Sequence, residues 1–497
     1  MPIEHLTIHS GRTPAPPRRR RFRWAVFFAV FIGIALVILI AGAFAIGSRL
    51  QTVLKNVKTV ALALPPEIIA VAPELIKDKT VLFLLLNNTE LRPGGGFIGS
   101  VGIADVRGGA LASFDTHDVY ALDRFGIGTI TAVPPEPIKK YLNVKAWYLR
   151  DANWSPDFAA SAVEVLRAYG EEAVLAGDAY PSVDAVVGVT PDFFIDLLRL
   201  TGPISVSGVT FTPENLTDEL EYHVERRFLE TGTPREQRKE IVGELGRELV
   251  VRLKPIARDR FPELLTTVLR AFREKHLMVF DKDPAAQRRF DALGWTGRVS
   301  SAPGDFLMVV DANLASLKSD PAVKRTISYR LEPDGSGLRA TATMQYVHHG
   351  RFDWKTTRYR TYTRFLVPRG AVFISGSGAM ENDKLKDPAR RPGKWDIGEE
   401  SGQTSFGAFI SVEPGETREL SVTYRLPAEI TDAIGNGVYT LLVQKQLGTA
   451  AHGLTLDLGF GKKLTSAAPP EEPSRFGDDR YALSTDLVQD RTFNLRF

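Results

Sequence analysis

A polar, glycine-rich stretch between two strand-like segments decides the fold. It consists of Asn87-Asn88-Thr89-Glu90-Leu91-Arg92-Pro93-Gly94-Gly95-Gly96-Phe97-Ile98-Gly99-Ser100. The unbroken apolar run of residues 80–86 ends in two asparagines, which is typical of a central strand covered on both faces. Residues 101–106 resume the strand pattern. Three glycines beside Glu90 and Arg92 predict a turn whose backbone approaches another group closely, next to a fixed cation.

An apolar segment precedes this stretch near the start of the chain. Residues 25–46 carry no charge, and at about 1.5 Å of rise per residue they cover the hydrocarbon core of a bilayer. Five arginines between residues 18 and 23 precede the segment, which predicts a cytoplasmic N-terminus and a folded part outside the cytoplasm. A cleaved signal peptide is the alternative, but its apolar region is usually shorter. We therefore expect a cytoplasmic basic tail (1–24), a single transmembrane helix (25–47) and a helical stalk (48–78).

Composition excludes several classes of function. The 497 residues exceed the usual size of one core, so two folded units are expected. A net charge of +3, without an array of arginines and aromatic residues, predicts no nucleic-acid partner. The chain has no cysteine, which excludes thiol catalysis and agrees with an exported protein that has a large core. No zinc-type spacing of histidines occurs.

The hydrophobic period changes once along the folded part. Helix starts are predicted at Ser155-Pro156, Thr190-Pro191, Thr212-Pro213 and Thr233-Pro234, with strands at 182–189 and 204–209 between them. Gly170 is predicted to close the first of these helices. Strands interleaved with helices indicate an α/β layered domain over residues 79–318. Beyond Pro321 apolar residues alternate with polar ones, which predicts a β-sandwich domain over residues 319–497.

Clustered arginines are the clearest candidates for a ligand site. Arg235 and Arg238 lie three residues apart near a predicted helix start, where free N–H groups and the helix dipole favour a phosphate or pyrophosphate. Arg226 and Arg227 precede them. The alternative is a solvated face on which nearby glutamates pair with these arginines.

Three further groups are candidates on the α/β domain. Asp115 and Asp118 follow a strand and could hold Mg²⁺ through carboxylate oxygens, or could be turn residues. Arg150 and Asp151 precede a predicted helix and could form an ion pair there. The turn with Glu90 and Arg92 could equally be a tight connection between strands. No Gly-x-Ser-x-Gly motif supports a serine hydrolase.

Three stretches resemble a bacterial membrane-anchored family of unknown function, number 4012. They are residues 87–100 with 114–120, residues 149–158 and residues 305–314. The resemblance implies a cell-envelope protein on the bacterial cell membrane and assigns no activity.

A more distant resemblance is to the LytR-CpsA-Psr proteins, which transfer polyprenyl-pyrophosphate-linked glycopolymers to the cell wall. The order of anchor, strand, arginine-bearing turn, Asp loop and capped helix is similar, and Arg235-Glu236-Gln237-Arg238-Lys239 is similar to their R-x-x-R-Q motif. The resemblance implies that Arg235 and Arg238, with Arg92, bind phosphate, and that Asp115 or Asp118 is the acid on the metal side. Their Arg-Ser-Asp-Thr and Pro-Arg-Asp motifs are absent, so the fold can be shared without the chemistry.

Two hypotheses follow for the function. In the first, the α/β domain binds or transfers a polyprenyl-pyrophosphate-linked glycan, with Mg²⁺ assisting and the arginines stabilising charge. In the second, the protein is a non-catalytic envelope scaffold or binding protein. Convergence of the arginines on one pocket, and an apolar groove for a polyprenyl chain, would favour the first hypothesis. Their separation into ion pairs would favour the second.

Overall fold

The structure of the protein is a computed structural model that describes most of the chain beyond residue 70. The described residues are 71, 73, 74, 77–108, 110–177, 180–232, 238, 240–301, 303–335 and 337–497. The predicted basic tail, the predicted transmembrane helix and most of the predicted stalk lie outside them. Within the described residues no helix is both long enough and apolar enough to cross a membrane.

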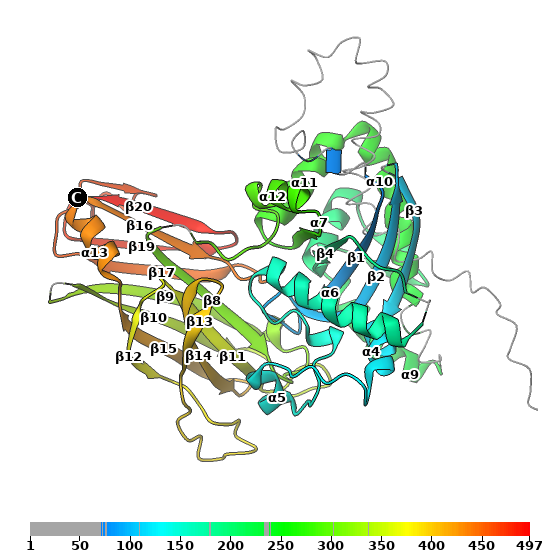
Figure 1. Cartoon of the computed structure of the whole chain (residues 1–497), viewed down its shortest axis with the longest axis horizontal. Helices are drawn as coiled ribbons and strands as arrows, with labels where there is room; N and C mark the ends of the chain where they lie inside the picture. The colour runs from blue at the N-terminus through cyan, green and yellow to red at the C-terminus, as the bar shows by residue number, and fades with distance from the viewer. Residues whose placement is uncertain are drawn as a thin grey trace, which may run out of the picture.

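A five-stranded mixed sheet forms the centre of the N-terminal part (Figure 1). Its order is β3-β2-β1-β4-β7, in which β1 and β4 are parallel and the other neighbours are antiparallel. The strands are β1 Lys79–Asn87, β2 Phe97–Arg107, β3 Ala110–Asp118, β4 Ala185–Val189 and β7 Leu277–Asp281. The apolar run at 80–86 therefore forms the middle strand, and the prediction of a central strand is confirmed.

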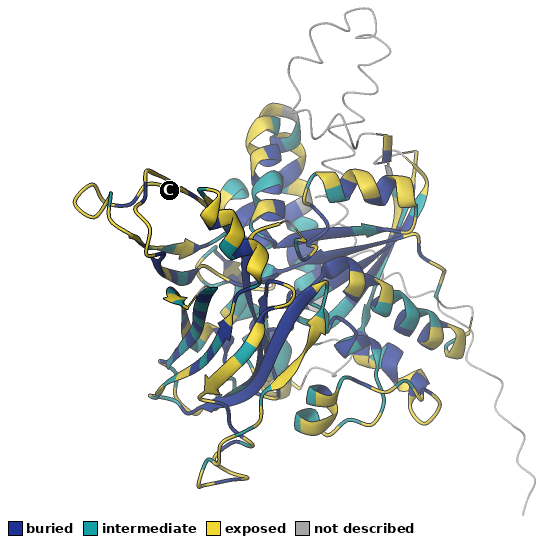
Figure 2. Ribbon diagram, turned by 60° about the vertical axis from the view of Figure 1, so that its left-hand side comes forward, coloured by how far each residue is buried: buried dark blue, intermediate teal, exposed yellow. Residues whose placement is uncertain are grey.

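Helices cover both faces of this sheet. Leu82, Leu84 and Leu86 pack on one side against the core that includes α6, whereas Val81 and Phe83 pack on the other side against α7, α10 and α11. Figure 1 shows α6 crossing the front of the sheet. In Figure 2 the strands are dark blue and the outer faces of the helices are yellow, which is the pattern of a buried central layer. The elements around the sheet are α4 Val119–Gly126, α5 Glu136–Leu142, η2 Leu149–Asp151, α6 Phe158–Leu175, α7 Pro191–Thr201, α8 Leu216–Tyr222, η3 His223–Arg227, α9 Phe228–Glu230, α10 Glu240–Asp259, α11 Phe261–Arg273, α12 Pro284–Ala292 and the hairpin β5 Ile204–Val206 with β6 Val209–Phe211.

The predicted helix starts hold to different degrees. Helix α7 begins after Thr190, as predicted, and ends at Thr201 with Gly202 as its C-cap. Helix α6 begins at Phe158 because the Asp157 carboxylate, rather than Ser155, accepts a hydrogen bond from a first-turn N–H. The prediction that Gly170 closes α6 is wrong, since the helix runs on to Leu175. Nothing lies within 4 Å of an ideal Cβ at Gly170, so this glycine sits within the helix without breaking it.

The C-terminal part consists of two packed sheets, which confirms a β-rich region there. One sheet has the order β12-β15-β10-β9-β17-β19 and the other β13-β14-β11-β8-β16-β20-β18. Inward-facing side chains of both sheets form a single core, the arrangement of a β-sandwich. The elements are β8 Asp305–Asn313, η5 Asp320–Ala322, β9 Val323–Asp334, β10 Gly337–His348, β11 Tyr359–Val367, β12 Val372–Ser377, β13 Asp396–Glu400, β14 Gln403–Val412, β15 Thr417–Arg425, α13 Ala428–Gly435, β16 Val438–Gln444, β17 His452–Gly459, β18 Ser466–Ala468, β19 Arg480–Leu487 and β20 Arg491–Arg496.

Strand β8 lies on the N-terminal side of the predicted boundary at residues 318 and 319. It nevertheless runs through the middle of the seven-stranded sheet, antiparallel to β11 and parallel to β16. All nine of its residues are buried, so it is covered on both faces. The β-rich part therefore begins with β8, and the chain enters it directly after the loop that follows α12.

Candidate functional site

The glycine-rich turn lies where the α/β part meets the β-sandwich. The Gly94 N–H donates to the Asn153 carbonyl over 3.0 Å, and Gly94 forms an isolated parallel bridge with Leu447 of the sandwich. An ideal Cβ at Gly94 would lie only 2.8 Å from both Cβ and the carbonyl oxygen of Asn153. The close approach predicted for this turn is therefore an approach to the protein's own backbone.

Gly448 completes the contact from the side of the sandwich. It has a φ of +70°, and an ideal Cβ there would lie 1.9 Å from the Gly95 carbonyl oxygen. Its N–H donates to the Lys275 carbonyl over 3.0 Å, and its carbonyl accepts a hydrogen bond from the Asn88 side chain over 2.8 Å. Glycine is required at this position by both the backbone angle and the lack of space.

A second set of hydrogen bonds runs beside this contact. The Leu91 N–H donates to the Asp320 carboxylate over 3.0 Å, and the Asn313 N–H donates to the Leu91 carbonyl over 2.9 Å. The Arg92 guanidinium donates to the Asn313 carbonyl over 2.6 Å. We call this set of contacts the interdomain joint, which consists of Asn88, Leu91, Arg92, Gly94, Gly95, Asn313, Asp320, Leu447 and Gly448.

Arg92 also belongs to a buried ionic cluster. Its guanidinium lies 3.5 Å from Asp151, which lies 3.5 Å from Arg150, and Arg150 donates to Asp123 over 2.5 Å. Asp123 in turn interacts with Glu172 of α6, whose carboxylate accepts the Leu149 N–H over 3.0 Å. We call Arg92, Asp123, Arg150, Asp151 and Glu172 the carboxylate–arginine cluster.

Burial and mutual repulsion change the protonation of two carboxyl groups in this cluster. Burial, followed by the nearby Asp123, raises the pKa of Glu172 to about 8. Burial likewise raises the pKa of Asp123, although Arg150 opposes the rise. Two adjacent buried carboxyl groups favour sharing one proton. With one shared proton, the cluster holds two cations and two anions and is close to neutral.

Only some members of this cluster could be predicted from the local sequence. Glu172 occupies the apolar face of α6, at helical spacing from Val165 and Tyr169, so a carboxyl group on a buried face was the available signal. Asp123 lies in a short helix without a comparable signal. Glu90, predicted in the same site, instead pairs with Lys318 over 2.9 Å and is not part of the cluster.

The remaining predicted arginines lie apart from the cluster. Arg238 lies 3.4 Å from Glu225 and 3.6 Å from Asp118. The Arg226 guanidinium stacks over the Trp354 ring, 5.8 Å from its centroid, and Arg227 lies 3.4 Å from the His223 ring nitrogen. Both Arg226 and Arg227 are exposed. Arg235 lies outside the described residues.

The structure does not bring Asp115 and Asp118 together. They are three residues apart on β3, in continuous register with β2, so their side chains leave opposite faces of the sheet. Asp118 caps α4 by accepting the Tyr120 N–H over 3.1 Å, and burial raises the pKa of Asp115. Among the described residues no group of three His, Asp or Glu side chains is arranged to hold a metal ion.

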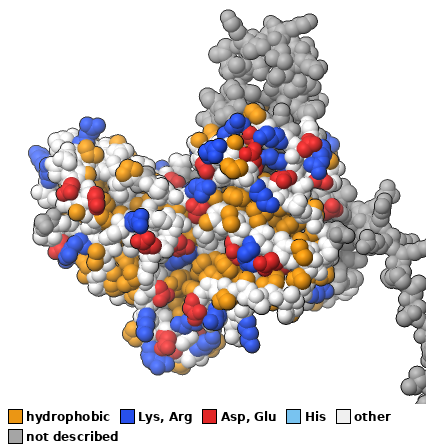
Figure 3. Space-filling model, in the orientation of Figure 1, with side chains coloured by type: hydrophobic (Ala, Val, Ile, Leu, Met, Phe, Trp, Pro, Cys, Tyr) orange, Lys and Arg blue, Asp and Glu red, His pale blue; other side chains and the backbone are white. Residues whose placement is uncertain are grey.

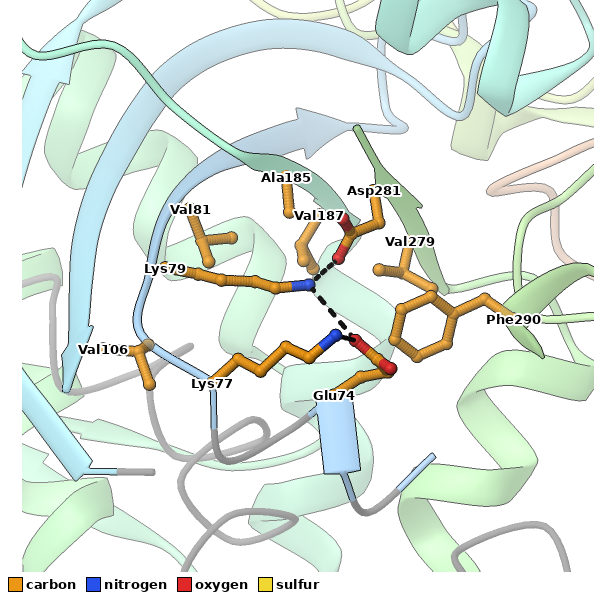
Figure 4. Close-up of a pocket in the computed structure, with 10 residues that line it drawn as sticks. All are labelled: Glu74, Lys77, Lys79, Val81, Val106, Ala185, Val187, Val279, Asp281 and Phe290. Atoms are coloured by element: carbon orange, nitrogen blue, oxygen red, sulfur yellow. Dashed lines mark hydrogen bonds and ion pairs between the residues drawn. The ribbon is translucent and has the colours of Figure 1, made fainter. Parts of the chain in front are cut away.

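A small cavity lies at the start of β1, at the opposite end of this strand from the glycine-rich turn (Figure 4). Valines and Phe290 line it, and Lys79 bonds Asp281 and lies 3.8 Å from Glu74 at its edge. Its volume of about 30 Å³ has room for a water molecule but not for a polyprenyl chain. On the face shown in Figure 3, basic and acidic side chains are interspersed over the described residues of both the α/β part and the sandwich.

Comparisons with solved structures give only distant likeness. A Legionella pneumophila protein assigned to nutrient binding is 8% identical, with a TM-score of 0.23, over 39% of this chain and 72% of that one. An M1 zinc metallopeptidase from Deinococcus radiodurans is 11% identical, with a TM-score of 0.16, over 39% of this chain and 43% of that one. Scores this low carry no argument about fold or function.

No curated protein sequence matches the chain. One N-terminal region contains the glycine-rich turn and the carboxylate–arginine cluster, and the predicted arginines at 226 and 227 lie just beyond it. That region, residues 77–224, matches the model of the family described as protein of unknown function (DUF4012).

Proposed function

We propose that the protein is a single-pass, membrane-anchored cell-envelope protein whose folded part, outside the cytoplasm, is a non-catalytic binding scaffold. The anchor and the location rest on the uncharged segment 25–46 and on the arginines before it. The absence of cysteine agrees with this location.

The observation that carries the non-catalytic role is the pairing of the buried Arg92 and of the half-buried Arg150 and Arg238 with carboxylates. Arg92 pairs with Asp151 and Arg150 pairs with Asp123, and Arg238 lies beside Asp118 and Glu225. A pyrophosphate bound to Arg92 or Arg150 would have to displace these carboxylates and leave them buried without partners, which costs several kcal/mol. The joint gives such a scaffold a fixed geometry, because it hydrogen-bonds the α/β part to the sandwich at several places.

The alternative is binding or transfer of a polyprenyl-pyrophosphate-linked glycopolymer, with Mg²⁺ as its metal. One observation favours it: Arg226 and Arg227 are exposed, and among the ion pairs between described residues none includes either of them. Among the predicted phosphate-binding arginines that the structure describes, these two are therefore available to an anionic lipid headgroup.

Native mass spectrometry of the detergent-solubilised full chain, purified from its own membrane, separates the two proposals. The probe is undecaprenyl pyrophosphate, added to wild type, to Arg226→Ala/Arg227→Ala and to the control Arg369→Ala, which alters an exposed arginine of the sandwich. The scaffold proposal predicts the same low adduct level for all three proteins. A stoichiometric adduct that is lost only in the double variant would overturn it.

A further inference from the structure

A cavity of about 810 Å³ opens on the outer face of the six-stranded sheet. Its floor is formed by β17 and the edge strand β19, where Thr455 pairs with Ser484 and Asp457 pairs with Ala482. Residues 471–478, in the connection between β18 and β19, form its other wall. Its volume falls in the range of small-ligand sites, roughly 300–1,000 Å³.

Glu471 is a buried carboxylate at this cavity with an unused oxygen. The residue is only 6% exposed, and one of its oxygens has no hydrogen-bond partner among the described residues. Burial raises the pKa of this carboxyl group, and the nearby backbone of Ala482 opposes the rise. A buried carboxylate oxygen without a protein donor favours a bound group that donates a hydrogen bond to it.

The other charges at the cavity are nearly balanced in sign. Asp457 pairs with Arg480 and lies 3.1 Å from Arg330, and Asp478 accepts the Arg480 N–H over 2.8 Å. Arg475 supplies a further guanidinium beside Glu471, and Glu472 supplies a further carboxylate. Side chains of both charges line the cavity, so a strongly charged ligand would be attracted by some of them and repelled by others. The lining therefore does not select such a ligand. The described residues also offer no group of three carboxylate or histidine side chains for a metal ion.

We infer that this cavity binds a saccharide, an uncharged ligand rich in hydroxyl groups. A hydroxyl both donates and accepts, so one sugar can donate to the Glu471 carboxylate and accept from the Arg475 guanidinium. The hydroxyls of Thr455 and Ser484 line the floor and can serve either role. This inference rests on the proposed role as a binding scaffold and names its ligand class.

Isothermal titration calorimetry of the full chain tests the inference, in a detergent without a sugar headgroup so that the micelle does not compete. The saccharide probes are cellohexaose, chitohexaose and maltohexaose, and spermidine represents a cationic ligand. The variants are Glu471→Ala, which removes the carboxylate, and Ser484→Trp, which fills the cavity from an exposed position of β19. The control is Asp479→Asn, an exposed carboxylate of the same segment that does not line the cavity.

We expect at least one saccharide to bind wild type and Asp479→Asn equally. Glu471→Ala should weaken that binding by at least about tenfold, and Ser484→Trp should abolish it. No heat with any of the three saccharides at millimolar concentration, binding of spermidine alone, or saccharide binding that survives Ser484→Trp would overturn the inference. The proposed function fails on a different result, a pyrophosphate adduct that depends on Arg226 and Arg227, so the two failures are distinguishable.

Discussion

At the scale of single residues, the cluster shows how burial decides the role of a charge. Arg92 is 5% exposed, and its partners Asp151 and Asn313 lie 59 and 221 residues away in the sequence. A pattern of neighbouring residues can mark Arg92 as unusual beside three glycines. It cannot show that the cation is used internally, because both partners come from distant segments.

Replacing Arg92 should therefore lower stability. Arg92→Ala removes one partner of a buried ion pair and leaves the Asn313 carbonyl without its donor, so we expect a loss of about 3–5 kcal/mol in the free energy of unfolding. Arg226→Ala, at an exposed position, should change it by less than about 0.5 kcal/mol. Urea unfolding of both variants measures the difference. Equal stability of Arg92→Ala and wild type would show that Arg92 has no structural role.

Glu172 makes stability depend on pH. Its pKa rises to about 8 in the folded protein from an ordinary value near 4.5, so the folded state holds a proton that the unfolded state releases. The contribution of Glu172 to the free energy of unfolding is fully present below about pH 4.5 and is lost as the pH rises through 8. In that pH window the free energy of unfolding falls by at most about 1.4 kcal/mol per pH unit.

Glu172→Gln should remove this slope, because the neutral amide oxygen can still accept the Leu149 N–H. Urea unfolding at several values between about pH 5 and pH 8 measures it. Glu171→Gln, an exposed neighbour on α6, is the matched control and should keep the slope of wild type. Parallel pH profiles for wild type and Glu172→Gln would contradict this account of the cluster.

At the scale of elements, the glycine-rich turn has one glycine in a crowded position and another in an open one. An ideal Cβ at Gly94 meets Asn153 at 2.8 Å, whereas nothing lies within 4 Å of one at Gly99. Gly94→Ala should lower the melting temperature of the protein, with a loss of roughly 2 kcal/mol or more as the Asn153 backbone shifts. Gly99→Ala should leave it nearly unchanged. Differential scanning fluorimetry gives both melting temperatures. Equal melting temperatures would show that the turn can accommodate a Cβ at residue 94.

The sequence predicts elements better than their pairing. The apolar run of β1, the start of α7 and the alternating strands β9 and β10 follow from local periodicity, and each is confirmed. Strand β8 is also a plain apolar run, but its sheet is set by pairing with β11 and β16, which lie far along the chain. The same limit applies to the candidate site, where Glu172 and Asp320 acquire their roles only through tertiary contacts.

At the scale of the whole molecule, the joint links two separately cored parts into one body. The backbone N–H groups of Leu91, Asn313 and Gly448 donate hydrogen bonds between the α/β part and the sandwich, and the Tyr141 ring of α5 stacks on Phe409 of β14 at 4.0 Å. Such contacts leave little freedom for relative motion. The proposed scaffold would therefore hold its two parts, and the cavity on the sandwich, in a fixed relation to each other.

Hydrogen exchange followed by mass spectrometry, on the full chain in detergent, tests the joint most directly. Gly448→Ala introduces a Cβ 1.9 Å from the Gly95 carbonyl, and the control Gly435→Ala adds one where nothing lies within 4 Å. We expect Gly448→Ala to raise exchange together in residues 87–97, 305–314 and 446–449, and Gly435→Ala to leave exchange in all three segments as in wild type. Exchange that rises only in residues 446–449 would contradict the claim that the glycine-rich turn is part of an interdomain joint.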